Sequence, residues 1–146
     1  MSEVTRCFED FSTGDVWPLG SKIVTRAEIA TYAAQFDPRE PYLSGDAAAP
    51  WHIGGLFMRQ YYDALLKGSS GRGSPGIEDL TWPALLKADE SMSAAAEVVE
   101  TRVSNSRPDM GLVKFRFIVR NERGDDVMVG TSWTMFGKRE VGHAMA

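Results

Sequence analysis

The sequence is poor in the residues that most often carry covalent and metal chemistry. Its 146 residues include one cysteine, Cys7, and two histidines. A single cysteine excludes an internal disulfide and a multi-cysteine metal site, and this usage fits a reducing compartment. No zinc-ligand spacing, Ser-His-Asp motif, phosphate-binding loop or nicotinamide fingerprint is present. We therefore expect no bound metal and no cofactor, and we expect a cytoplasmic location.

An excess of positive charge is also missing. Sixteen Lys and Arg residues stand against 20 Asp and Glu residues, which gives a net charge of −4. A surface that binds nucleic-acid phosphates needs a basic excess, so nucleic acid is not an expected partner. No apolar run approaches the roughly 20 residues of a membrane span, and the first residues lack the basic-then-apolar pattern of a secretion signal. No membrane partner is expected either.

The remaining composition is typical of a globular protein. Hydrophobic residues make up 43% of the sequence and charged residues 25%, which are ordinary fractions. A chain of this length can bury a hydrophobic core without disulfides or metal. We expect one domain over residues 1–146, with an ordered core from about 8 to 139. Residues 141–146 have no apolar pattern and are predicted to be disordered.

The first half of the chain carries helical periodicity. Residues 16–24 are predicted to form an extended edge strand. Thr25, followed three residues later by Glu28, forms a capping box that begins a helix. This helix is expected to end near Phe36, because Pro38 restricts the residue before it.

A second helix is predicted from about Trp51 to Lys67, with its apolar residues on one face. Gly54 and Gly55 lower its helix propensity, so their presence suggests that another backbone or a ligand comes close. The glycine-rich segment 68–76 that follows is predicted to be a flexible loop.

From residue 77 onward the hydrophobic period changes to two. Segments 77–82 and 94–103 are predicted strands, and the alternation is clearest in 113–120 and 127–135. The turn residues 121–125 indicate a hairpin between the last two strands. An apolar helix followed by an antiparallel meander predicts an α+β fold with the sheet packed on that helix. This order of elements is that of a hotdog fold, in which an antiparallel sheet wraps around a central helix.

Five short segments carry a resemblance to one family. They are Phe8-Glu9-Asp10-Phe11 with Gly14-Asp15, Ala34-Gln35-Phe36-Asp37-Pro38, Trp51-His52, Ser74-Pro75-Gly76-Ile77-Glu78-Asp79-Leu80 with Trp82, and Ser104-Asn105-Ser106-Arg107-Pro108-Asp109-Met110-Gly111. In this order and spacing they resemble the MaoC-like hydratases, a hotdog family that includes (R)-specific enoyl-CoA hydratases. The resemblance covers most of the chain. It implies a homodimer or higher homo-oligomer, often with the site near the interface.

The resemblance also implies a reaction, the reversible addition of water to the trans-2-enoyl group of an acyl-CoA thioester. In the family an aspartate and a histidine five residues later hold the water, and backbone N–H groups at the start of the central helix bind the thioester oxygen. The aspartate falls on Asp37, and the position five residues later is Tyr42. His52 begins the second helix and is a candidate to replace the missing histidine. The substrate-binding positions implied are Trp51, Ile53, Gly54 and Gly76.

The tyrosine changes the chemistry that the loop can perform. Tyrosine has an ordinary pKa of about 10, against about 6.5 for histidine, so it is a poor base at neutral pH. The segment 43–50 behind it is also shorter than is usual in the family. Three functions stay open. The first is a hydro-lyase that uses Asp37, assisted by Tyr42 or His52. The second is a silent hotdog protein that binds an acyl thioester or supports a partner subunit. The third is a thioesterase that uses Asp63 or Asp37.

Overall fold

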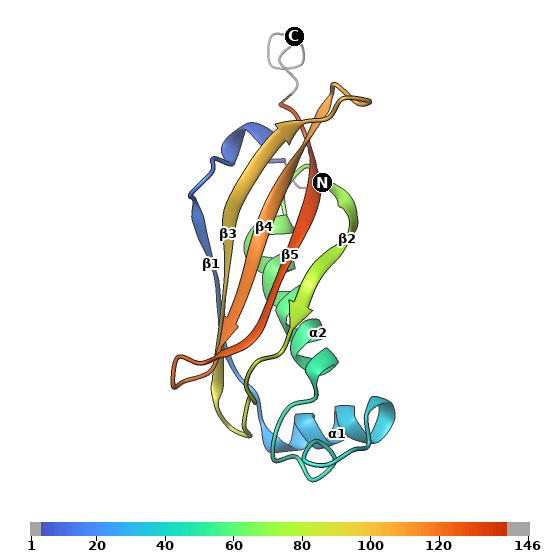
Figure 1. Cartoon of the computed structure of the whole chain (residues 1–146), viewed down its shortest axis with the longest axis vertical. Helices are drawn as coiled ribbons and strands as arrows, with labels where there is room; N and C mark the ends of the chain where they lie inside the picture. Colours follow the sequence, from blue (N-terminus) through green and yellow to red (C-terminus); the bar gives the residue numbers. More distant parts are fainter. Residues whose placement is uncertain (1–3, 140–146) are drawn as a thin grey trace.

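A curved antiparallel sheet that wraps along one long helix dominates the architecture (Figure 1). The computed structural model describes residues 4–139. The strands are β1 (Val16–Ile23), β2 (Gly71–Thr81), β3 (Ser91–Val103), β4 (Met110–Arg120) and β5 (Asp126–Gly137), and the helices are α1 (Arg26–Phe36) and α2 (Pro50–Tyr61). Two short elements complete the set, the 3-10 turn η1 (Phe8–Asp10) and the π-helical turn η2 (Tyr62–Leu66), which extends α2.

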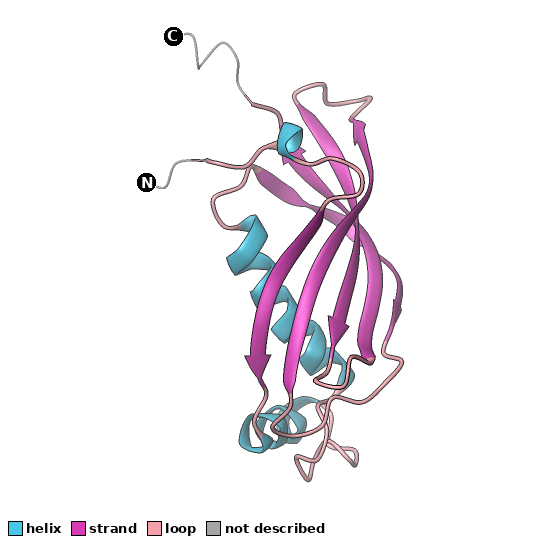
Figure 2. Ribbon diagram, turned by 90° about the vertical axis from the view of Figure 1, so that its left-hand side faces the viewer, coloured by secondary structure: helices cyan, strands magenta, loops and turns pink. Residues whose placement is uncertain are grey.

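The sheet order is β1-β3-β4-β5-β2, and every neighbouring pair is antiparallel. Helix α2 runs along one face of the sheet, and α1 lies across its lower end (Figure 2). This arrangement confirms the predicted α+β class and the hotdog topology. None of the helices within residues 4–139 is long and apolar enough to cross a membrane.

Alternation along the central strands builds the core. Val113, Phe115, Phe117 and Val119 of β4 are all buried, and the residues between them are partly exposed. In an extended strand successive side chains point to opposite faces, so one face of β4 packs on α2 and the other faces outward. From α2 the buried residues Ile53 and Phe57 complete this core.

The capping box fixes the start of α1. The Thr25 side chain accepts a hydrogen bond from the Glu28 backbone N–H, and the Glu28 carboxylate accepts one from the Thr25 backbone N–H. The helix ends at Phe36, as predicted. Ile29 and Ala33 are buried, but Phe36 is 69% exposed and packs only at the edge, against Tyr32.

The prediction of a flexible loop over residues 68–76 is wrong for most of that segment. Strand β2 begins at Gly71 and pairs with β5, with three irregularities in its register. Gly73 and Gly76 have φ values of +113° and +154°, a region that residues with a side chain rarely adopt. The glycines therefore permit a strongly bulged edge strand. The prediction of disorder for 141–146 concerns residues outside the described range.

Candidate functional site

Asp37 lies where α1 ends, and an arginine occupies both of its carboxylate oxygens. Arg39 Nε donates to Oδ1 at 2.7 Å and its terminal nitrogen donates to Oδ2 at 2.8 Å. The hydrogen bonds from Arg39 hold the pKa of Asp37 below its ordinary value. The Asp37 side chain is 17% exposed, whereas that of Arg39 is mostly in solvent. Asp37 is thus an ionised carboxylate that is already engaged.

Tyr42 lies in the turn that follows. Its ring lies beneath the Arg39 guanidinium, 5.6 Å from the carbon of that group, and its backbone N–H donates to the Arg39 carbonyl at 2.9 Å. Asp37, Arg39 and Tyr42 therefore form one cluster, which we call the loop cluster. Sequence reasoning placed Asp37 and Tyr42 together but missed Arg39, whose position two residues after Asp37 is the signal that could have revealed it.

His52 is buried and packs against Tyr32 of α1. Its ring stacks on Tyr32, with centroids 4.5 Å apart and an angle of 7° between the planes. Burial lowers the pKa of His52, so the neutral imidazole is favoured. Within residues 4–139, its Nδ1 atom is buried without a hydrogen-bond partner. Its role as a replacement for the missing histidine stays a prediction.

The start of α2 offers fewer free backbone donors than a regular helix. Pro50 has no N–H, and the N–H groups of His52 and Ile53 both donate to the Ala49 carbonyl at 3.0 and 3.1 Å. Among the described residues no backbone acceptor bonds the Trp51 N–H. The N–H of Trp51 is therefore a donor within the first turn of this helix that remains available to a ligand.

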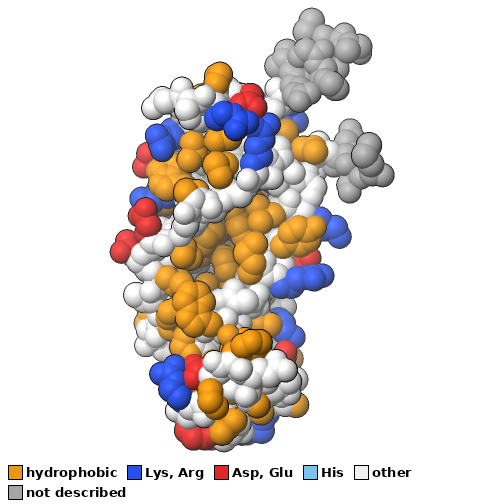
Figure 3. All heavy atoms as spheres, turned by 90° about the vertical axis from the view of Figure 1, so that its right-hand side faces the viewer, with side chains coloured by type: hydrophobic (Ala, Val, Ile, Leu, Met, Phe, Trp, Pro, Cys, Tyr) orange, Lys and Arg blue, Asp and Glu red, His pale blue; other side chains and the backbone are white. Residues whose placement is uncertain are grey.

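An apolar cavity of about 730 Å³ lies between α2 and the edge of the sheet. We call it the α2–β2 cavity. Its wall contains residues from α2, the π-helical turn, β2, β4 and β5: Trp51, Gly54, Gly55, Phe57, Met58, Tyr61, Tyr62, Leu66, Ser69, Gly71, Gly73, Ser74, Gly76, Ile77, Leu80, Phe117, Met128, Ser132 and Thr134. Figure 3 shows hydrophobic side chains gathered around a hollow on this face. A cavity of this size and character can hold the apolar part of a small ligand.

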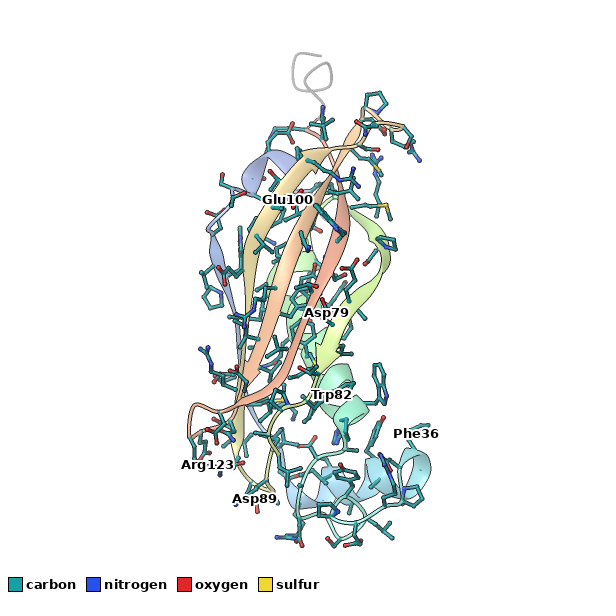
Figure 4. The ribbon with its side chains drawn as sticks, viewed as in Figure 1. Phe36, Asp79, Trp82, Asp89, Glu100 and Arg123 are labelled. Carbon is teal, nitrogen blue, oxygen red and sulfur yellow. The ribbon has the colours of Figure 1, made fainter. Side chains whose placement is uncertain are left out.

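The cavity brings together only part of the predicted site. Trp51, Gly54 and Gly76 line it, but the buried side chain of Ile53 packs in the core. Asp37, Tyr42 and His52 are not among the lining residues. Trp51 is 64% exposed at the cavity, and its ring packs edge-on with that of Trp82, with centroids 5.0 Å apart. Trp82 lies beside the first turn of α2 and above the helix that carries Phe36 (Figure 4).

Three polar residues on the cavity wall were missed by sequence reasoning. Tyr61, Ser132 and Thr134 are buried, and their hydroxyl groups lie among aromatic and aliphatic side chains. Ser132 and Thr134 lie at alternate positions of β5 whose side chains point toward the core. The neighbouring strand β4 carries phenylalanine and valine at the paired positions. Hydroxyl residues at inward positions are the signal that could have identified them.

Other charged residues near this region are paired with one another. Asp63, the candidate for a thioesterase, accepts a hydrogen bond from Arg59 at 2.8 Å on the exposed face of the helix and does not line the cavity. Arg72 pairs with Asp109 of the β3–β4 connection at 2.8 Å. Over residues 4–139, no group of three His, Cys, Asp or Glu side chains could hold a metal ion.

The comparisons with known proteins agree with this fold. A scan against family models gave no match, and a search of curated proteins gave none either. Among solved structures, the MaoC-like dehydratase from Rhodospirillum rubrum is 26% identical with a TM-score of 0.83, over 94% of this chain and 100% of that one. The R-hydratase PhaJ1 from Pseudomonas aeruginosa is 15% identical with a TM-score of 0.71, over 95% and 89%. The ChsH1-ChsH2 complex from Mycobacterium tuberculosis is 19% identical with a TM-score of 0.63, over 86% and 98%.

The sheet, the central helix and these comparisons define a hotdog-fold protein. Its structural neighbours are the MaoC-like dehydratases and (R)-hydratases, as the sequence resemblance predicted.

Proposed function

We propose that the chain adds water reversibly to the trans-2-enoyl group of an acyl-CoA thioester. The observation that carries this proposal is the α2–β2 cavity, which begins at the first turn of α2 and is walled by apolar side chains. An acyl chain can lie in such a cavity. The thioester carbonyl then lies at the start of α2, where the Trp51 N–H and the positive end of the helix dipole stabilise the developing negative charge.

In this proposal the loop cluster provides the proton chemistry. Asp37 accepts a proton from the water whose oxygen bonds to the β-carbon, and the same carboxyl group then gives this proton to the α-carbon. Its lowered pKa keeps the resting carboxylate ionised at neutral pH. Arg39 holds the carboxylate in one orientation through two hydrogen bonds. Tyr42 orients the water or the leaving hydroxyl by hydrogen bonding. The chemistry requires no metal or cofactor.

One observation favours a second function, that of a protein that binds acyl thioesters without turnover. Both oxygens of Asp37 are engaged by Arg39, and a carboxylate held in this way is a weaker base toward water. The loop also has tyrosine at position 42, where the resemblance expects histidine. In this alternative the cavity binds the acyl chain, and the loop cluster has a structural role.

A second copy of the chain is part of the proposal. The edge strand β2 is exposed along most of its length, and Trp51, Met58, Tyr62 and Ile77 are exposed apolar residues around the cavity mouth. An exposed edge next to an apolar surface favours pairing with another chain. We propose a homodimer in which this face is covered. The solved neighbours include a complex of two different chains.

The test is a spectrophotometric assay with trans-2-enoyl-CoA substrates of increasing chain length. Loss of enoyl absorbance without release of free thiol indicates hydration, whereas free CoA indicates hydrolysis. In a hydratase, Asp37→Asn is expected to lower kcat by on the order of 10²- to 10⁴-fold, because the general base is lost. Asp63→Asn is the matched control, since its carboxylate lies outside the cavity, and it is expected to retain activity.

The outcomes separate the functions. Full activity in Asp37→Asn would contradict the mechanism. An absence of turnover combined with measurable binding of acyl-CoA would support the binding protein. Release of CoA that is lost in Asp63→Asn would support the thioesterase instead.

A further inference from the structure

A pair of buried hydroxyl groups lies on the wall of the α2–β2 cavity, away from the helix start. Tyr61 Oη and Thr134 Oγ1 are 2.8 Å apart, and the two residues are 5% and 4% exposed. Both side chains line the cavity. Burial raises the pKa of Tyr61, so its hydroxyl remains protonated and neutral. We call these two side chains the hydroxyl pair.

One of the two hydroxyl hydrogens of the hydroxyl pair has no hydrogen-bond acceptor among the described residues. Two O–H groups carry two hydrogens, and a hydrogen bond between them uses one. Among the described residues neither oxygen has another hydrogen-bond partner. The second hydrogen therefore lacks a protein acceptor, and the remaining lone pairs of the two oxygens lack a protein donor.

Ser132, on the same wall, is a buried residue whose hydroxyl hydrogen does have an acceptor in the protein. Ser132 Oγ donates to the Gly76 carbonyl at 2.7 Å and lies 2.9 Å from Ser74 Oγ. The Ser74 hydroxyl also has the Gly76 carbonyl as an acceptor, at 3.1 Å. Both serine hydrogens thus have acceptors within the protein, which the hydroxyl pair lacks.

The surroundings of the hydroxyl pair make its free hydrogen costly. The ring of Tyr61 packs against Phe57, Phe115 and Phe117, with centroids 4.9 to 5.9 Å apart. When a ligand fills the cavity, a hydrogen-bond donor that finds no acceptor there is unfavourable. An oxygen atom on a ligand in the cavity removes this penalty, whereas a purely hydrocarbon ligand leaves it in place.

The position of the pair along α2 sets where that oxygen must be. Tyr61 follows Trp51, whose N–H is the proposed donor to the thioester oxygen, by ten residues, and a helix rises about 1.5 Å per residue, or about 15 Å over this distance. A long side chain on a helix points back toward the helix N-terminus, so the Tyr61 hydroxyl lies somewhat closer to the carbonyl than this. We propose that the hydroxyl pair binds an oxygen atom of the acyl chain, a hydroxyl or carbonyl, roughly 10–15 Å from the thioester carbonyl. This inference rests on the proposed acyl-thioester site and names the class of acyl group that the site selects.

The experiment compares two substrates of equal chain length. One is trans-2-decenoyl-CoA and the other is its ω-hydroxy derivative, whose hydroxyl lies at about the required distance. The ratio of their kcat/KM values is measured for the wild type and for the double variant Tyr61→Phe/Thr134→Val, which removes both hydroxyls with little change in shape. Both must be removed, because either single variant leaves one hydroxyl whose hydrogen is free. The matched control is Thr131→Val, because Thr131 lies on the same strand but its side chain points to the opposite, outward face of the sheet.

We expect the wild type to prefer the hydroxylated substrate. This preference should fall by roughly three- to tenfold in the double variant, the change that corresponds to one neutral hydrogen bond. Thr131→Val should keep the wild-type ratio. Equal kcat/KM values for both substrates in the wild type, or an unchanged ratio in the double variant, would overturn the inference while leaving the hydratase proposal intact.

A binding measurement separates failure of the inference from failure of the proposed function. If neither substrate is turned over, the affinities of decanoyl-CoA and ω-hydroxydecanoyl-CoA are compared by calorimetry. A tighter complex with the hydroxylated compound, lost in the double variant Tyr61→Phe/Thr134→Val, would support the polar subsite in a protein that only binds. Equal affinities would overturn it.

Discussion

Asp37 and Arg39 decide how much acid–base chemistry the loop cluster can perform. The guanidinium binds both carboxylate oxygens, and its position over Tyr42 adds a contact with the ring. A base must exchange at least one of these hydrogen bonds for one to water before it can accept a proton. The pairing therefore orients Asp37 and also weakens it as a base.

Replacing Arg39 with methionine is expected to raise the pKa of Asp37 toward its ordinary value of about 3.8, since the hydrogen bonds that lower it are lost. The pair lowers the pKa of Asp37 in the folded state relative to the unfolded chain. It therefore stabilises the fold above the unfolded-state pKa, and this contribution is lost as the pH falls through the folded-state pKa. The measurement is a carboxyl ¹³C NMR titration, with Asp37→Asn to assign the resonance.

Arg59→Met is the control for this experiment, because it breaks the Arg59–Asp63 pair on α2 and leaves the loop cluster untouched. It should not move the Asp37 titration. An Asp37 carboxyl that titrates at the same pH in Arg39→Met and in the wild type would show that the ion pair does not control it.

Gly54 and Gly55 leave α2 without side chains at two adjacent positions that border the cavity. A Cβ at Gly54 would meet only the Trp51 ring at 3.5 Å, and a Cβ at Gly55 would meet nothing within 4 Å. Neither glycine is required by a close backbone approach from another element. Their small size instead leaves the cavity open along the first turns of α2.

Gly55→Ala is consequently expected to raise the free energy of unfolding by about 0.5–1 kcal/mol, because alanine loses less conformational freedom in a helix. Chemical denaturation measures this change. Gly111→Ala provides the contrast, since its Cβ would lie 2.3 Å from the Phe8 ring, and it should lower stability. A loss of stability in Gly55→Ala would mean that the open space is needed by the fold.

The sequence predicts the helices better than the edge strand, for a physical reason. The capping box at Thr25 and the apolar face of α2 are local signals, and both helices lie where these signals place them. The segment from Gly71 to Gly76 has few side chains that could alternate. Its strand character comes from pairing with β5, more than fifty residues later, and no local pattern encodes that pairing.

Likewise, local sequence predicts one part of the candidate site and does not predict the other. The loop cluster follows from neighbouring positions, so Asp37 and Tyr42 could be identified together. The cavity requires the curvature of the sheet over α2, which brings Thr134 of β5 to 2.8 Å from Tyr61. Tyr61 and Thr134 are 73 residues apart in the sequence, so their pairing can be identified only in the folded structure.

At the scale of the whole molecule, the cavity and the exposed sheet edge occupy the same face. Strand β2 borders the cavity and is also the unpaired edge of the five-stranded sheet. The hydrophobic side chains that surround the hollow in Figure 3 are therefore next to backbone groups that lack a strand partner. In the proposed homodimer, the second copy both pairs with this edge and limits the access of water to the cavity.

Ile77→Lys tests this arrangement, because Ile77 is an exposed apolar residue on β2. A stable interface buries roughly 1,200–2,000 Å², and an uncompensated charge within it should shift the protein toward the monomer. Sedimentation velocity over a range of concentrations measures the shift. Val16→Lys is the matched control, since Val16 is equally apolar, is exposed, and lies on β1 at the opposite edge of the sheet. Dissociation caused by Val16→Lys but not by Ile77→Lys would place the interface at the β1 edge and separate it from the cavity.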